Sequence, residues 1–332
     1  EGEPMPEEIE DALDDPNVMW HAWNAQFERT IWKHVLGRKI PVKRMRDTMV
    51  SALYCSFPAK LEKAGQALNL GEDFQKDNRG KTLIRKFCQP RKPTKKLLHT
   101  RCDRFTDPEA WEEFKNYCIQ DVVSERHIGQ YLAKYPMPDD EWRNWQLDQI
   151  INDRGIPISR WAVKNARKIQ DYVYDDRISR MIEITGLDNP NSGAQLLPWL
   201  QKEGYPYDDL RAAHVKRAIE DYGEDDEEDY ADMVDVLSMR AEISKTSVKK
   251  YAAVDMALDP DDMLRQCFQF YGAQRTGRYA GRRLQPQNLP RPAWYLEKPE
   301  DIMQAVLEME LFTPDAFCAL WDQPMEVLAS CI

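Results

Sequence analysis

The sequence predicts an α+β amino-terminal region, of α/β character, followed by a mainly α-helical region. A short apolar run of strand type, Val18 to Trp23, stands among helical segments near the beginning of the chain. After a joint rich in proline and charge at Lys134 to Asp140, apolar residues recur mostly at helical spacing. The chain has 332 residues, which is enough for two domains with separate cores.

Composition and charge limit the classes of protein to consider. Hydrophobic residues make up 42% and charged residues 31%, as in globular proteins. No apolar run is long enough to span a bilayer and no secretory signal is visible, so we expect a cytoplasmic protein without a membrane partner. The 7 cysteines are odd in number and form no CxxC pair, which argues against a zinc site and a disulfide framework. We expect reduced thiols, mostly in the core.

The net charge of -11 is unevenly distributed along the chain. Acidic residues gather in residues 1–15 and 220–235, whereas residues 79–104 and 265–291 are rich in Lys and Arg. An acidic protein can therefore still carry basic grooves that bind phosphate.

The amino-terminal region contains one predicted helix that begins at Ala25, capped by Asn24. Its buried face is expected to consist of Phe27, Ile31, Trp32 and Val35. Glu28 lies in the first turns of this helix, where a carboxylate is ordinarily explained by the helix dipole.

Three more helices are predicted before the joint: Asp47 to Cys55, one that opens at Pro58, and Glu109 to Tyr131. The last is expected to bury Trp111, Phe114, Cys118, Val122 and Ile128.

Tyr117 and Asp121 stand at i and i+4 on the helix Glu109 to Tyr131, so their side chains are neighbours. They could point into one site, or be ordinary polar surface. Residues 77–93 are predicted as a basic, turn-rich loop, either solvated or following a phosphate backbone.

The second region is predicted as an array of helices with one strand. The helices are Glu141 to Asn152, Trp161 to Glu183, one capped at Asn191 to Gly193 and ending at Leu200, Asp208 to Ile219, Met233 to Ala253, Pro299 to Leu307 and Pro314 to Leu328, and the strand is Met263 to Phe270.

The stretch from Phe270 to Arg291 has the composition of a nucleic-acid contact. It combines five arginines with three glycines and several side-chain amides, and it lacks the periodicity of a packed helix or strand. Arginine forks suit phosphate oxygens and base edges, and glycines allow close approach of the backbone. The alternative is a solvated basic hairpin, and composition alone does not choose between the two.

In this order the segments resemble a family A DNA polymerase of the phage type, with a 3′–5′ exonuclease domain of the Asp-Glu-Asp-Asp tyrosine subclass joined to a helical thumb. Trp23 to Glu28 resembles the second exonuclease motif, Tyr117 to Asp121 the third, and Asn152 to Ile156 the entry to the thumb. Thr276 to Arg278 with Gln287 to Pro290 resembles the primer-binding segment.

The resemblance implies a domain order. Residues 1–136 would form an incomplete RNase H-like exonuclease domain, residues 137–261 a helical thumb-like domain, and residues 262–332 the start of a polymerase palm with the primer-template binding segment. The first exonuclease motif, an Asp-x-Glu pair, and the palm carboxylates are not found. We therefore expect an internal piece of a polymerase, whether cloned, proteolytic or encoded by a split gene.

The resemblance also implies roles for three residues in hydrolysis of a terminal phosphodiester. Asp121 would be a direct metal ligand, Glu28 the outer or second-metal carboxylate, and Tyr117 the group that orients the attacking water. Glu28 stands where Asp is more usual in the family. Mg²⁺ or Mn²⁺ is expected only if the missing carboxylates are supplied, because hard cations need several oxygen ligands.

DNA contacts are implied at Arg278, which would reach the minor groove beside the primer terminus, and at several other residues. These are Asn24, Lys245, Thr246, Lys249, Lys250, Arg275, Thr276, Gln287 and Asn288. The expected partners are primer-template and single-stranded DNA, and the remaining polymerase segments.

The function that we expect is that of a DNA-directed DNA polymerase, a nucleotidyltransferase with a proofreading nuclease used in phage DNA replication, of which this chain alone has little activity. A phage-encoded protein would act in the cytoplasm of the bacterial host. The alternative is a non-catalytic DNA-binding or assembly subunit of a split polymerase. A helical protein without a nucleic-acid role would have to contain four motifs in the family's order by chance.

Overall fold

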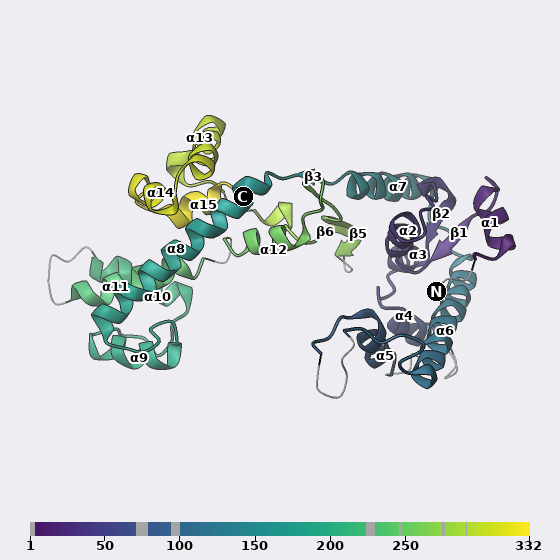
Figure 1. The fold of residues 1–332 in the computed structure, drawn as a ribbon, viewed down its shortest axis with the longest axis horizontal. Coiled ribbons are helices and arrows are strands. Elements are labelled where there is room, and N and C mark those ends of the chain that lie inside the picture. The colour runs from purple at the N-terminus through teal and green to yellow at the C-terminus, as the bar shows by residue number, and fades with distance from the viewer. Residues whose placement is uncertain are drawn as a thin grey trace. The chain divides into compact units, whose positions relative to one another are not determined.

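The computed structural model describes residues 4–70, 79–93, 100–223, 230–245, 248–273, 276–289 and 291–332. Over these ranges the protein is mainly helical, with three two-stranded sheets (Figure 1). The chain divides into two compact units. Unit 1 is Glu1–Asp153 with Phe268–Ala280, and unit 2 is Arg154–Cys267 with Gly281–Ile332. The mainly helical character predicted for the second region is confirmed. In the first region, predicted as α+β, the structure shows helices with small two-stranded sheets, and the three domain identities stay predictions.

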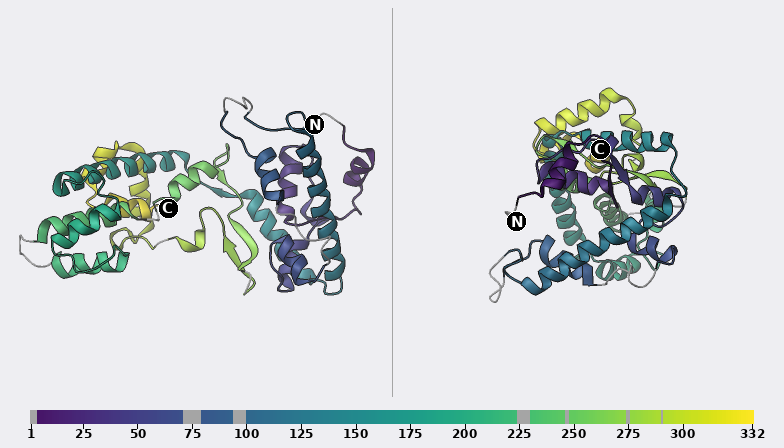
Figure 2. Two further views of the ribbon diagram at one scale, coloured as in Figure 1. Left: turned by 90° about the horizontal axis from the view of Figure 1, so that it is seen from below. Right: turned by 90° about the vertical axis from the view of Figure 1, so that its right-hand side faces the viewer.

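Unit 1 contains a parallel pair of strands surrounded by helices. Its elements are α1 (Glu7–Asp14), β1 (Trp20–Ala22), α2 (Ala25–His34), a 3-10 turn (Val42–Arg44), β2 (Met45–Asp47), α3 (Thr48–Tyr54), α4 (Leu61–Ala67), α5 (Arg79–Cys88), α6 (Pro108–Leu132), α7 (Asp139–Arg154), β5 (Phe268–Ala273) and β6 (Arg278–Gly281). β1 pairs with β2 in the register Trp20 to Met45 and Ala22 to Asp47. The long helix α6 packs against α3, α4 and α5 (Figures 1 and 2).

Helix α6 begins where its sequence predicts. Asp107 accepts a hydrogen bond from the backbone N–H of Ala110 (3.1 Å), and Pro108 occupies the first turn, where a missing N–H costs nothing. Its fully buried apolar residues lie near its carboxyl end, where Ile128 and Leu132 are buried with Ala52 and Ala64.

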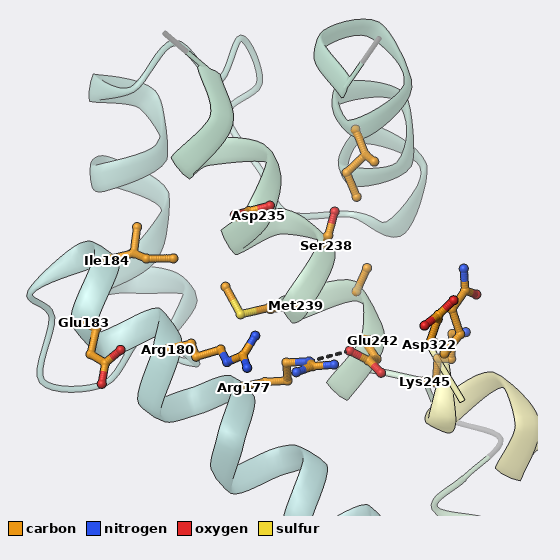
Figure 3. A pocket seen from close by; sticks show the side chains of 13 residues that line it. Arg177, Arg180, Glu183, Ile184, Asp235, Ser238, Met239, Glu242, Lys245 and Asp322 are labelled. Carbon is orange, nitrogen blue, oxygen red and sulfur yellow. Dashed lines mark hydrogen bonds and ion pairs between the residues drawn. The ribbon is translucent and has the colours of Figure 1, made fainter. Parts of the chain in front are cut away.

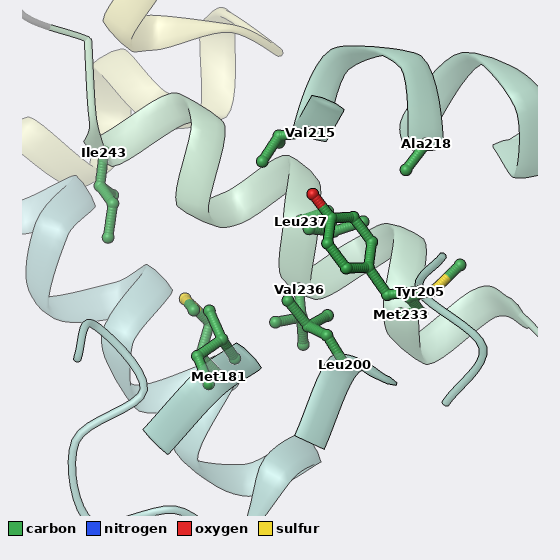
Figure 4. Close-up of a cluster of buried hydrophobic side chains, with 10 residues drawn as sticks. Met181, Leu200, Tyr205, Val215, Ala218, Met233, Val236, Leu237 and Ile243 are labelled. Atoms are coloured by element: carbon green, nitrogen blue, oxygen red, sulfur yellow. The ribbon is translucent and has the colours of Figure 1, made fainter. Parts of the chain in front are cut away.

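Unit 2 is built on the long helix α8. Its elements are β3 (Ile156–Pro157), α8 (Arg160–Thr185), α9 (Gly193–Lys202), α10 (Ala212–Gly223), α11 (Ala231–Ile243), α12 (Lys250–Ala257), β4 (Met263–Leu264), η4 (Pro286–Asn288), η5 (Trp294–Leu296), α13 (Pro299–Leu311), α14 (Pro314–Leu320) and α15 (Pro324–Ser330). Ser159 caps α8, and Gly186 ends it in the left-handed conformation at φ 66°. The carboxyl-terminal half of α8 shares with α9, α10 and α11 a core that includes Met181, Leu200 and Leu237 (Figure 4).

Several predicted elements differ from those observed. Part of the predicted basic loop is the helix α5, because Leu83 and Phe87 stand at helical spacing and are buried against α6. Phe87 stacks on Phe114 with ring centroids 5.4 Å apart. Over residues 79–88 the helical spacing of apolar residues therefore determines the structure, despite the basic composition. Residues 77, 78 and 94–99 lie outside the described residues.

Two predicted helices are each divided in two. The predicted helix Met233 to Ala253 is α11 and α12, with Ile243 and Val248 both buried on either side of the break. The predicted helix Pro314 to Leu328 ends at Leu320, and Pro324 starts α15 in its first turn. Proline lacks the N–H that would continue a helix, which explains the second break.

Two predicted buried faces are wrong in part. On α2, Phe27 is 60% and Val35 69% exposed, whereas Ala25 and Arg29 are buried. On α6, Cys118 and Val122 are exposed.

All seven cysteines are free, as expected, but they are not mostly in the core. Only Cys102 and Cys267 are buried.

We expected that the stretch from Phe270 to Arg291 would not be a packed element. This expectation is wrong for the first half of the stretch. Phe270 belongs to β5, which pairs with β6 in a two-stranded sheet, and its side chain is buried beside Trp145. The predicted strand Met263 to Phe270 is interrupted, because β4 ends at Leu264 and β5 starts at Phe268. Gln274, Arg275 and Pro290 lie outside the described residues.

Candidate nucleic-acid site and its surroundings

Unit 1 contains a cavity of about 550 Å³ to which the β1–α2 segment and the helices α4, α5 and α6 contribute. Glu28 from α2 and Asp121 from α6 both line it. The structure thus brings together two candidate residues that stand 93 positions apart in the sequence. Lys60 and Lys81 are exposed residues of the same lining, and Glu62 and Glu125 add further carboxylates.

Glu28 lies in an environment that disfavours its charged form. Burial raises the pKa of its carboxyl, and the charge of Glu125 adds to this effect, while a backbone hydrogen bond opposes it. Its Oε2 atom is buried without a hydrogen-bond partner. A ligand in the cavity could supply that partner.

Tyr117 is held beside Asp121 on α6. Its hydroxyl donates to the Asp121 carboxylate, and burial, followed by this bond and the charge of Asp121, raises the pKa of the phenol. The ring stacks on Phe114 (6.4 Å between centroids) and packs against Gly80 of α5 so closely that a Cβ at Gly80 would overlap it. Tyr117 itself does not line the cavity, so Asp121 links the phenol to it.

Asp47 organises the start of α2 and was not among the predicted site residues. Its two carboxylate oxygens accept from the backbone N–H groups of Asn24 and Ala25, both at 3.0 Å, and also cap α3 through Met49 (3.0 Å). Asn24 has a φ of 66° and makes no capping bond with its side chain, so its predicted capping role is wrong. Burial raises the pKa of Asp47 to about 7, against the lowering effect of these backbone hydrogen bonds.

Glu125 is a second carboxylate that was not among the predicted site residues. It follows Asp121 by one helical turn, is buried, and accepts a hydrogen bond from the Thr48 hydroxyl. Its spacing of four residues from Asp121 is the signal that could have identified it. Asp47 has a weaker signal, an N-cap residue before an apolar run, which predicts a helix start but not the bonds to α2.

The carboxylates of the cavity do not amount to a metal site in the described part of the chain. No group of three or more His, Cys, Asp or Glu side chains there could hold a metal ion. Glu28 and Asp121 line one cavity but do not supply the oxygen-rich ligand set that Mg²⁺ needs.

Asn152 and Asp153 of the motif Asn152 to Ile156 connect α7 to other elements of unit 1. The Asn152 amide donates to the backbone oxygen of Phe268 (3.1 Å) and accepts from its N–H (3.0 Å), which fixes β5 on α7. Asp153 pairs with the buried Arg29, which also donates to Gln149 at 2.7 Å, so α2 is fixed on the same helix.

Two predicted DNA contacts meet in unit 2, where Lys250 of α12 bonds to Asn288 of η4. Lys249 and Gln287 are their neighbours in the chain, and we call these four residues the α12–η4 surface. The Lys250 ammonium donates to the backbone oxygen of Asn288 (3.1 Å), and the side chains of Lys249 and Gln287 are exposed. Amide and ammonium groups on one surface suit phosphate and sugar contacts.

The remaining predicted contacts belong to other parts of the chain. Thr276 and Arg278, both exposed, belong to the β5–β6 hairpin of unit 1. Lys245 lines a separate cavity of unit 2, of about 690 Å³, in which Arg177 pairs with Glu242 (Figure 3). That lining has three basic and four acidic side chains, so it does not concentrate positive charge. Thr246 and Arg275 lie outside the described residues.

Comparison with known proteins relates the chain to a DNA polymerase. The relative is the DNA polymerase of Bacillus phage SP02, which is 43% identical over 292 residues. The match covers 87% of this chain and 44% of the relative, so the chain spans less than half of the relative's length. No protein-family model matches the sequence. Among the described helices, none is long and apolar enough to cross a membrane.

Proposed function

We propose that this chain is the part of a family A, phage-type DNA polymerase that carries the 3′–5′ exonuclease domain and holds primer-template DNA. The observation that carries the proposal is the 43% identity to a phage DNA polymerase over 87% of the chain. The structure is consistent with it, because Glu28 and Asp121, from two separate exonuclease-like motifs, line one cavity.

In this proposal the cavity of unit 1 receives the 3′ end of a single strand. Asp121, which accepts from Tyr117, lines the cavity and would position a water molecule there, and Lys60 and Lys81 lie in position to attract phosphates. Mg²⁺ or Mn²⁺ is expected in this cavity only if further carboxylates are supplied, because hard cations need several oxygen ligands. Since the described carboxylates form no metal site, we expect the isolated chain to have little nuclease activity.

DNA holding is assigned to Arg278 on the hairpin and to the α12–η4 surface. Binding through such phosphate contacts releases counterions, so affinity should fall steeply as salt rises.

The test is a fluorescence anisotropy titration of the whole chain with a labelled primer-template at several salt concentrations, together with a magnesium-dependent trimming assay. We expect weak, salt-sensitive binding and no trimming. Binding that ignores ionic strength, or efficient 3′ trimming of single-stranded DNA, would contradict the proposal.

A second candidate is a non-catalytic DNA-binding or assembly subunit of a split polymerase. The observation that favours it is the lack of a metal-holding cluster among the described residues. Sequencing the coding region on both sides of this chain distinguishes the two candidates. An Asp-x-Glu strand and palm carboxylates in the same reading frame would support the polymerase, and their presence in another gene would support the subunit.

A further inference from the structure

A small cavity of about 240 Å³ in unit 2 has chemistry that the proposed function does not use. The amino-terminal turns of α8 and the α13–α14 connection line it, with Trp161 and Lys168 from the first and Leu311 and Phe312 from the second. Trp161 is 70% exposed and Phe312 is 43% exposed. Two aromatic rings at this cavity are therefore accessible from solvent.

Two lysines continue the face of α8 that begins with Trp161. Lys164 and Lys168 follow Trp161 by three and seven residues, which places all three on one side of the helix, and both lysines are exposed. Asn165 holds the second lysine at the cavity. Its Oδ1 atom accepts from the Lys168 ammonium and its Nδ2 donates to the backbone oxygen of Glu310, both at 3.2 Å.

We propose that this cavity binds single-stranded nucleic acid, with one base stacked against Trp161 and Phe312 and the adjoining phosphates along Lys164 and Lys168. Aromatic rings beside a row of cations are what single strands require, because every base has a π-face and every linkage a negative charge. The cavity volume, about 240 Å³, is below the usual range for a drug-sized ligand and suits a single base. This site is separate from the residues assigned to the primer-template, and the proposal does not depend on them.

An apolar protein surface is the competing occupant. Met303 and Leu307 are exposed on α13 and extend the apolar side of the cavity. Nucleic acid is favoured because the cores of protein interfaces are depleted in lysine, whereas here one lysine lines the cavity and a second stands one turn away. A second copy of the chain is therefore treated as an outcome of the test.

The test measures binding of fluorescein-labelled oligo(dT) of twelve nucleotides to the whole chain by anisotropy. We expect Trp161→Ala to weaken binding at least about fivefold, and Trp161→Phe to retain most of it. The double substitution Lys164→Ala with Lys168→Ala should lower the slope of log affinity against log salt by about 1.4, as expected for two lost phosphate contacts on a single strand. Trp294→Ala is the matched control, since Trp294 is 82% exposed and stands outside this cavity.

Three results would overturn the proposal. Trp161→Ala could bind oligo(dT) as tightly as the unchanged chain, or Trp294→Ala could weaken it equally. Sedimentation could show a dimer that Trp161→Ala abolishes, which would assign the surface to self-association. Lys164→Glu with Lys168→Glu gives a second test that leaves Trp161 in place. If oligo(dT) binding depends on Trp161 while primer-template does not bind, the proposed function fails and this inference stands.

Discussion

The acidic cavity of unit 1 and the α12–η4 surface of unit 2 are constructed differently. At the cavity, Glu28 is placed by a buried framework in which Asp47 fixes the start of α2 and Thr48 bonds to Glu125. At the surface, Lys249 and Gln287 are exposed and Lys250 makes one hydrogen bond to a backbone oxygen. The cavity should therefore be sensitive to single buried substitutions, whereas the surface should lose affinity in small steps without losing stability.

The largest effect is expected for Asp47→Ala. This change removes the acceptor for the N–H groups of Asn24, Ala25 and Met49 and leaves those of Ala25 and Met49 buried without partners. We expect the free energy of unfolding to fall by about 3–5 kcal/mol, from the lost cap and the unsatisfied donors. Urea denaturation measures it, with the exposed Asp171→Ala as control. Equal stability of the two variants would show that Asp47 does not organise α2.

A smaller loss is expected for Asn152→Ala, which separates β5 from α7. Its amide exchanges two hydrogen bonds with the backbone of Phe268, and the residue is almost fully buried. We expect a loss of about 2–4 kcal/mol, since both backbone groups lose their partner. Thermal unfolding measures the loss against Arg154→Ala, an exposed neighbour. A melting temperature equal to that of the control would show that Asn152 does not connect β5 to α7.

Asp47 should also make stability depend on pH. Because its pKa is raised to about 7, the folded protein holds a proton that the unfolded chain has already released above about pH 4. The contribution of Asp47 therefore falls as pH rises from about 4 to about 7. Asp47→Asn removes this titration, so its free energy of unfolding should depend less on pH in that window. If the free energy of unfolding of Asp47→Asn depends on pH as steeply as that of the unchanged chain, Asp47 does not cause this pH dependence.

The smallest effect concerns Lys249 of the α12–η4 surface. Lys249→Ala should leave the melting temperature unchanged and lower the slope of log affinity against log salt for primer-template DNA by about 1. Anisotropy at three salt concentrations measures it, with the exposed Lys202→Ala as control. A slope equal to that of the control would show that Lys249 does not contact DNA.

The sequence predicts a helix well where the residues that start it and the apolar residues that it buries lie in one segment. The helix predicted over Glu109 to Tyr131 is observed as α6, because Asp107 and Pro108 mark its start and apolar residues follow at helical spacing. The helix predicted over Trp161 to Glu183 is likewise observed as α8.

The rest depends on contacts between segments far apart in the chain. The burial of Arg29 in place of Phe27 follows from its bonds to Gln149 and Asp153 of α7, which the pattern of α2 cannot reveal. At the candidate site, Glu28 and Asp121 were found through their motifs. Asp47 and Glu125 were missed because their bonds join separate elements.

The proposed holding of primer-template DNA is tested most directly by the affinity of the double variant Arg278→Ala with Lys249→Ala. Anisotropy at low salt compares it with the unchanged chain and with Lys202→Ala, and a thermal scan confirms that all three fold. We expect a loss of at least about tenfold in primer-template affinity, since each charged contact contributes about 1 kcal/mol or more. Affinity equal to that of the unchanged chain would contradict it.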